Sequence, residues 1–197
     1  SRDIPHFVDA FFEIVSGFTT TGASIVPAVE DLSKGILYWR SFSHWLGGMG
    51  VLVFLLALSP GGNGSGFTMH LLRAESPGPD VGKLVPHMRK TAALLYMIYV
   101  AMTIVNILFL LAGGMTLFEA VCHAFGTAGT GGFGVLGDSI ASYPIPQQTI
   151  ITIFMILFGV NFNAHFFLFL GKDKKEAFRL SEVRWYFAII AFSILTI

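Results

Sequence analysis

Charged side chains are scarce in this sequence. They make up 12% of its 197 residues, whereas hydrophobic residues make up 54%. Soluble domains usually carry about 25% charged residues, because their surface faces water. The apolar residues also come in long runs, and phenylalanine alone occupies 20 positions. This composition excludes an ordinary soluble domain and indicates an integral membrane protein.

Other features are missing too. Cys122 is the single cysteine, which excludes an intrachain disulfide and a cysteine-based zinc site. The net charge is zero, so it gives no argument for a nucleic acid or an acidic substrate. The first residues lack the basic and apolar regions of a signal peptide. The chain lacks an initiator Met and stops inside an apolar run, so we expect a fragment of a longer polypeptide.

The apolar runs predict membrane-crossing helices. Residues 36–58, 91–113 and 147–170 are each close to the roughly 20 residues that span a bilayer core. A fourth run begins near residue 183 and continues to the end of the chain. Two shorter helical stretches, at residues 5–17 and 116–126, are too short to span. Lengths of about a dozen residues are typical of re-entrant or buried helices.

The basic residues predict the orientation of these segments. Nine of the 12 Lys and Arg residues fall between the first and second spans or between the third and fourth: Arg73, Lys83, Arg89, Lys90, Lys172, Lys174, Lys175, Arg179 and Arg184. The positive-inside rule places both segments in the cytoplasm. Acids gather on the other side, where they would concentrate cations or simply be solvated loop charges: Asp3, Asp9, Glu13, Glu30, Asp31, Glu119 and Asp138.

An internal repeat relates the two short-helix regions at an offset of 110 residues. Asp9-Ala10 aligns with Glu119-Ala120, and thirteen residues separate each acid from Gly22 or Gly132. The stretch TTGAS, residues 20–24, then aligns with TGGFG, residues 130–134. Motif, spacing and context agree, so we predict a repeat whose first unit lacks its leading span.

The residue types in these loops suit ion conduction. An irregular backbone at membrane depth is tolerated only when it is buried in protein or lines a water-filled cavity. A potassium filter needs backbone carbonyls that replace the water around the ion. Glycine permits the positive φ values of such a turned backbone. Several oxygens must converge, and four loops around an axis can supply them whereas one cannot.

The TGGFG stretch resembles the T-x-G-Y/F-G filter of potassium channels. The chain as a whole resembles the Trk/Ktr/HKT superfamily of potassium transporters, closest to the bacterial Trk-type potassium uptake membrane subunit. The strings that carry this resemblance are FTTTGAS at 18–24, WLGGMGVLV at 45–53, LLRAESPGP at 71–79 and GGFG at 131–134.

The resemblance implies an all-α integral membrane fold of repeated span, pore helix, loop and span units, with two of the four units present. Residues 1–60 would form the first pore unit and 61–90 a cytoplasmic connector. Residues 91–171 would form the second unit, and 172–197 a cytoplasmic loop with the start of the next span. The key glycines map onto Gly22 and Gly132, and the residues that bind potassium through backbone carbonyls would be Thr20, Thr21, Gly22, Ala23, Thr130, Gly131, Gly132 and Phe133.

The implied function is channel-like potassium uptake across the bacterial inner membrane, with the filter loops facing the periplasm. Potassium is the transported ion, and we expect no organic cofactor and no enzymatic activity. Membrane lipid, a homodimer and a cytoplasmic nucleotide-binding regulatory subunit are implied as partners. Ala23-Ser24 departs from the channel pattern Tyr-Gly, so the first loop should hold ions less rigidly. A sodium or mixed cation transporter is an alternative, although glycine at both key positions favours potassium.

Other readings of the polar residues stay open. An intramembrane enzyme would use His123 or His165 with nearby acids, but no polar cluster supports it. A metal site would need His44 and Cys122 as well, and these lie in separate segments. GTGGFG at 129–134 also matches a dinucleotide-binding motif, yet it lacks the preceding strand and following helix. For His165, helix-to-helix hydrogen bonding is favoured over pore lining.

Three features allow two interpretations each. Gly47, Gly48 and Gly50 either permit close helix packing, the favoured interpretation, or form a hinge. Arg40 either extends to the headgroups or lines the pore. Residues 59–86, rich in Gly and Pro, form either a simple cytoplasmic connector or a docking surface.

Overall fold

A computed structural model describes residues 3–50, 88–169, 174, 177 and 180–196. All regular secondary structure in these residues is helical, which confirms the predicted all-α class for this part of the chain. The elements are α1 (Phe7–Phe18), the short 3₁₀ helix η1 (Val29–Asp31), α2 (Lys34–Gly48), α5 (Met88–Ala112), α6 (Leu117–Ala128), α7 (Ile145–Gly159), α8 (Phe162–Phe169) and α10 (Ser181–Thr196).

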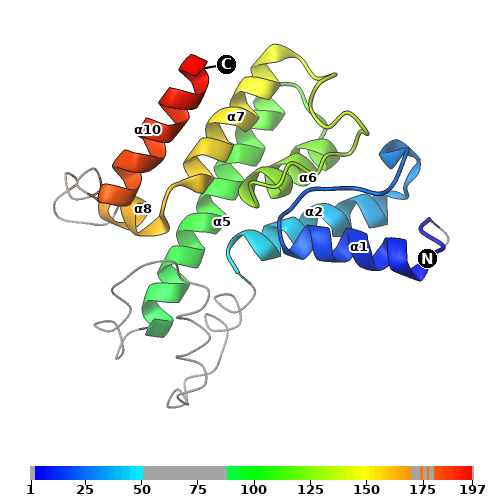
Figure 1. Cartoon of the computed structure of the whole chain (residues 1–197), viewed down its shortest axis with the longest axis horizontal. Coiled ribbons are helices and arrows are strands. Elements are labelled where there is room, and N and C mark those ends of the chain that lie inside the picture. The colour runs from blue at the N-terminus through cyan, green and yellow to red at the C-terminus, as the bar shows by residue number, and fades with distance from the viewer. Residues whose placement is uncertain (1–2, 51–87, 170–173, 175–176, 178–179, 197) are drawn as a thin grey trace.

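Helix α2 joins the two halves of the described structure. It packs against α1 on one side and against α6 on the other, and α6 in turn packs against α5 and α7. Figure 1 shows α5 and α7 running side by side, with α6 leading from them to α2 and α1. The two short helices predicted at 5–17 and 116–126 are present as α1 and α6. They therefore share one neighbour, α2.

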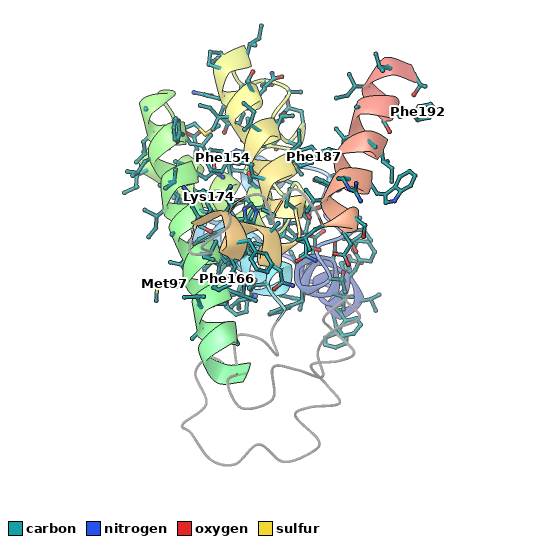
Figure 2. All side chains as sticks on the ribbon, turned by 90° about the vertical axis from the view of Figure 1, so that its left-hand side faces the viewer. Met97, Phe154, Phe166, Lys174, Phe187 and Phe192 are labelled. Atoms are coloured by element: carbon teal, nitrogen blue, oxygen red, sulfur yellow. The ribbon has the colours of Figure 1, made fainter. Side chains whose placement is uncertain are left out.

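Helix α5 is the one continuous helix in the described residues that is long and apolar enough to cross a membrane, over Ala92–Ala112. This confirms the helix predicted at 91–113. One face of α5 exposes large apolar side chains, including Met97 and Leu108, and Figure 2 shows Met97 at the outer edge of the molecule. The opposite face buries Tyr99, Asn106 and Leu110 completely. The helix therefore has an outward apolar face and an inward packed face.

The single helix predicted at 147–170 is wrong. The chain forms α7 and α8 instead, with a bend of 96° between them. Val160 is extended at the break (φ −72°, ψ 139°), and the Asn161 side chain accepts a hydrogen bond from the Asn163 amide at 2.9 Å. An Asn in this position caps a new helix and so favours a restart over continuation. Counted together, the bent pair would be a second candidate span.

Side chains satisfy the backbone at this break. His165 Nε2 lies 2.9 Å from the carbonyl oxygen of Leu157, and the Tyr186 hydroxyl donates to the Ile156 carbonyl at 3.0 Å. Freed backbone groups in an apolar setting need such partners. The favoured interpretation of His165, a hydrogen bond between helices, is confirmed because the residue on α8 pairs with α7.

The other two predicted spans are described in part. Helix α2 ends at Gly48, and residues 51–58 lie outside the described residues, as do 59–86 and therefore most of the connector. Helix α10 begins at Ser181 and exposes large apolar side chains along most of its length, and Figure 2 shows Phe187 and Phe192 on its surface. These exposed residues are Trp185, Phe187, Ile189, Phe192, Ile194 and Leu195.

Glycines let α2 approach its neighbours closely. A Cβ atom on Gly47 would overlap the Phe18 carbonyl, and one on Gly48 would lie 2.7 Å from both the Gly129 Cα and the Tyr99 hydroxyl. Real Cβ atoms essentially never come nearer than 3.0 Å to another heavy atom. The packing interpretation is confirmed for Gly47 and Gly48. This close contact brings the ends of α1 and α6 together.

Candidate functional site: two glycine loops in contact

Helices α1 and α6 each contain 12 residues, and their boundaries correspond at the predicted offset of 110. Each leads into a loop with the same backbone pattern. Thr20 and Thr130 have φ values of 55° and 52°, and Gly22 and Gly132 have φ values of 75° and 85°. We refer to residues 20–24 as the first glycine loop and to residues 130–134 as the second glycine loop. Two segments that share few side chains thus adopt one backbone conformation.

Local chemistry positions the second glycine loop by fixing the start of α6. The Thr116 side chain and Glu119 form a capping box, with the Thr116 hydroxyl donating to Glu119 Oε2 at 2.7 Å. This hydroxyl lowers the pKa of Glu119, and partial burial opposes the effect. The acid at 119 therefore caps the helix. At α1 the residue before the helix, His6, forms no side-chain cap.

The two glycine loops touch through their backbones. A Cβ atom on Gly22 would overlap the Gly131 carbonyl oxygen, and one on Gly131 would lie 2.7 Å from the Thr20 carbonyl oxygen. A Cβ on Gly132, in contrast, would meet nothing within 4 Å. The structure therefore brings Thr20, Gly22 and Gly131 together, while Gly132 faces open space within the described part of the chain.

Two serine hydroxyls donate hydrogen bonds to carbonyl oxygens of these loops, and the sequence motifs did not indicate either serine. Ser16 donates to the Ala23 carbonyl at 2.6 Å, and Ser139, itself at a φ of 60°, donates to the Gly132 carbonyl at 3.0 Å. A carbonyl has two lone pairs, so each keeps one acceptor position. The remaining loop carbonyls predicted to bind potassium accept no hydrogen bond from the described residues: Thr20, Thr21, Gly22, Thr130, Gly131 and Phe133.

A buried ion pair lies behind the first glycine loop. Arg40 Nε is 2.8 Å from Glu13 Oε2, and the two side chains are 4% and 2% exposed. Glu13 Oε1 accepts from the Ser24 hydroxyl at 2.8 Å and from the Ile25 amide at 2.7 Å. Arg40 Nη2 also donates to the Ser24 hydroxyl at 3.1 Å. One carboxylate and one guanidinium therefore fix the end of this loop.

Of the two interpretations left open for Arg40, extension to the headgroups is wrong, and of the two for Glu13, a solvated loop charge is wrong, because both side chains are buried. The sequence does contain a feature from which this ion pair could have been predicted. Ionisable residues within apolar helices are expensive unless they are paired, so an acid in α1 and a base in α2 indicate partners.

Phe133 links the two halves of the site. Its ring is 3% exposed and lies 4.2 Å from the Arg40 guanidinium carbon. The His44 ring stacks on it at 4.1 Å with an interplanar angle of 14°. Phe133 belongs to the second glycine loop, whereas Arg40 and His44 belong to α2. The side chain predicted to complete the second loop thus anchors that loop to α2.

The alternative sites find no support in the geometry. Among the described residues, no group of three or more His, Cys, Asp or Glu side chains could hold a metal ion. His44, Cys122 and His123 are each buried in helix packing. The glycine motif at 129–134 follows helix α6, whereas a dinucleotide site requires a strand there.

Comparison with known proteins shows the family of this chain. The family model for the cation transport protein TrkH matches residues 2–195. The chain belongs to the TrkH family. It is 39% identical over 183 residues to the Trk system potassium uptake protein TrkH of Escherichia coli K12, covering 92% of this chain and 38% of that protein. It is 34% identical over 195 residues to the Trk system potassium uptake protein TrkG of the same strain, covering 97% of this chain and 39% of that protein.

The fold also matches a solved member of the TrkH family. The crystal structure of the potassium transporter TrkH from Vibrio parahaemolyticus superimposes with a TM-score of 0.73 at 29% identity, covering 98% of this chain and 38% of that one. The chain therefore spans less than half the length of the relatives it matches. These relatives are named as transporters, which points away from an enzyme and towards a membrane transport protein.

Proposed function

We propose that this chain forms part of a potassium uptake pathway, in which the two glycine loops present backbone carbonyl oxygens to the ion. The observation that supports this most strongly is the shared conformation of the loops. Thr20 matches Thr130 and Gly22 matches Gly132 in the sign and size of φ, and the loops are in backbone contact. A carbonyl-lined filter needs several turned backbone segments around one axis, and these two loops would supply half of the four.

The free carbonyls provide the chemistry. Six of the eight residues proposed to bind potassium have carbonyl oxygens that accept no hydrogen bond from the described residues. The Thr20 and Gly131 oxygens among them lie against the opposite loop, and the other four would be available to replace water around a cation. The other two, Ala23 and Gly132, keep one lone pair each while a serine holds them. No covalent chemistry is needed, and the membrane potential would drive the ion through.

The proposed architecture is four units around one axis, with this chain contributing two. Residues 1–60 and 91–171 are the two units, residues 61–90 a cytoplasmic connector, and residues 172–197 lead to a further unit. The surface of α1 supports this arrangement. Val8 and Phe11 are 72% and 61% exposed, whereas their counterparts Phe118 and Val121 on α6, which packs against α5 and α7, are half-buried. A span equivalent to α5 would cover this apolar face.

The membrane setting and the partners follow from the family. We place the protein in a bacterial inner membrane as a multi-pass protein surrounded by lipid, with the glycine loops towards the periplasm. The relatives are described as members of a Trk system, and we propose a homodimer with a cytoplasmic nucleotide-binding regulatory subunit. Potassium is favoured over sodium because both key positions, 22 and 132, are glycine.

Substitution of Gly132 by Ser in the full-length protein tests this function. Potassium and sodium uptake are measured in cells that lack their own potassium uptake systems. Gly132 has a φ of 85° and open space around its Cβ position, so a serine changes the local backbone without a clash within the described residues. We expect the preference for potassium over sodium to fall.

Gly35→Ser is the matched control for this test. Gly35 lies in α2 away from the loops, and a Cβ there meets nothing within 4 Å. An unchanged ion preference in Gly132→Ser, at wild-type protein levels, would remove the assignment of the second glycine loop as a filter.

A further inference from the structure

We infer that the Glu13–Arg40 ion pair is a positioning device that sets the ion discrimination of both glycine loops together. The inference rests on the proposed function and deepens it. The pair has contacts in each half of the site. Glu13 holds the first loop through the Ser24 hydroxyl and the Ile25 amide, and Arg40 packs over Phe133 of the second loop. No other ion pair is observed among the described residues.

The contacts of Glu13 fix the backbone of the first loop. Its Oε1 accepts two hydrogen bonds from consecutive residues, and its Oε2 accepts from Arg40 Nε. Hydrogen bonds to a charged acceptor are stronger than those between neutral groups. The residue Ser24 follows directly after Ala23, so its position limits where the carbonyl of Ala23 can point. The carboxylate thus acts on the predicted filter segment without touching the ion.

The contacts of Arg40 extend the same control to the second loop. The guanidinium carbon lies 4.2 Å from the centre of the Phe133 ring, and Arg40 Nη1, although buried, has no hydrogen-bond partner among the described residues. The π face of an aromatic ring attracts a guanidinium, most strongly where water is excluded. The Phe133 ring therefore provides the remaining interaction of the cation. Moving Arg40 would move Phe133, whose neighbours are Gly132 and Gly134.

Charge neutrality explains why both partners are needed. An unpaired buried arginine near a cation pathway would repel the ions, and an unpaired buried glutamate would attract a counterion of its own. Paired, the two residues leave little net charge and keep their geometric effect. A rigid support of this kind fixes the spacing of loop carbonyls, and this spacing is one means by which a site distinguishes potassium from the smaller sodium ion.

The test uses the full-length protein and measures ion discrimination per folded molecule. Rubidium uptake is recorded against increasing sodium, and the folded amount is measured by size-exclusion chromatography of a fluorescent fusion. The variants are Arg40→Lys, Glu13→Gln with Arg40→Gln, and Phe133→Leu. Arg40→Lys keeps the charge but cannot contact Glu13 and Ser24 through a planar fork. The double variant leaves no unpaired buried charge, which protects folding.

A second cation and ring provide matched controls, Lys34 on α2 and Phe118 on α6. Lys34→Gln removes a cation of α2 that is exposed and lies 5.7 Å from the Phe118 ring, and Phe118→Leu removes that ring. We expect these to retain wild-type discrimination. In the three test variants we expect discrimination against sodium to fall by about tenfold, the scale of one hydrogen bond to a charged group or of one buried cation–π contact.

The possible outcomes separate the two proposals. Lower discrimination in the test variants, with wild-type values in the controls, supports the positioning role. Test variants that fold to wild-type amounts and discriminate normally would overturn it, as would variants that lose only folded protein while the remaining molecules discriminate normally. If the wild-type protein takes up no potassium, or Gly132→Ser keeps its preference, the proposed function itself fails.

Discussion

Gly22 and Gly131 are in direct backbone contact, because a single methyl group on Gly22 would occupy the position of the Gly131 carbonyl oxygen. These residues belong to matching loops from the two halves of the chain. The contact explains why the first loop keeps glycine at this position although its neighbours Ala23 and Ser24 depart from the pattern of the second loop. It also makes Gly22 and Gly132 unequal, since a Cβ on Gly132 would meet open space.

Gly22→Ala should therefore destabilise the protein more than Gly132→Ala. Both residues have positive φ, so alanine costs about 1–2 kcal/mol of backbone strain at either position. At Gly22 the overlap with Gly131 adds to this cost. The measurement is thermal unfolding of the purified full-length variants, with Gly35→Ala as control. Equal losses at positions 22 and 132 would show that the loops are not in contact in the native protein.

The contact of α2 with α5 and α6 should be sensitive to one methyl group. Gly48→Ala places a Cβ 2.7 Å from the Tyr99 hydroxyl and from Gly129 Cα, and we expect a loss of about 1–3 kcal/mol. Tyr99→Phe removes the hydrogen bond of 2.8 Å to the Trp45 carbonyl and should cost about 1 kcal/mol. Combining the two should cost less than the sum, because losing the hydroxyl makes room for the methyl. Chemical denaturation in detergent gives the values, and strict additivity would contradict this packing.

The buried ion pair should show strong coupling in stability. Removing one partner leaves a buried charge unpaired, which costs about 3–5 kcal/mol, whereas removing both does not. Glu13→Gln and Arg40→Gln alone should each lower the melting temperature more than the double variant does. A double-mutant cycle on thermal unfolding measures this coupling. A double variant whose loss of stability equals the sum of the two single losses would show that the pair makes no coupled contribution.

Glu119 should give a pH-dependent contribution to stability. Its pKa is lowered from 4.5, first by the Thr116 hydroxyl. A carboxyl whose pKa is lower in the folded state stabilises that state above its unfolded pKa, and loses this effect as the pH falls through the folded pKa. Thr116→Val should therefore reduce stability at neutral pH. In this variant the melting temperature should also fall less steeply with decreasing pH below about pH 5. Glu119→Gln should remove the same pH dependence of the melting temperature. If both variants showed the pH dependence of the wild type, this result would argue against the capping box.

Ser139 should affect the apparent affinity for potassium without being needed for folding. Ser139→Gly removes the hydroxyl that donates to the Gly132 carbonyl, and glycine accepts the φ of 60° without strain. The lost hydrogen bond of about 1 kcal/mol and the relieved backbone should nearly cancel in stability. We expect a changed apparent affinity for potassium in uptake assays at constant protein level. Ser142→Gly, in the same exposed segment, is the control, and equal affinity in both variants would count against a role for Ser139.

Much of the fold could be predicted because its signals are local. Hydrophobic run length predicted α5, and short apolar stretches before glycine loops predicted α1 and α6. The break between α7 and α8 could not be predicted from hydrophobicity, since residues on both sides are equally apolar. It depends on Asn161 as a cap and on His165 and Tyr186 as partners for freed carbonyls, and those partners come from other turns and another helix.

The sequence by itself indicated the membrane class, the offset of 110 between the two short helices and the left-handed backbone at Gly22 and Gly132, because these depend on composition, spacing and the absence of a Cβ atom. Only the tertiary structure decided that the two glycine loops touch, that Glu13 and Arg40 pair across 27 residues, and that Phe133 packs on that pair. Such contacts join residues far apart in the chain, and which of the few charged side chains meet is fixed by how α1, α2 and α6 pack.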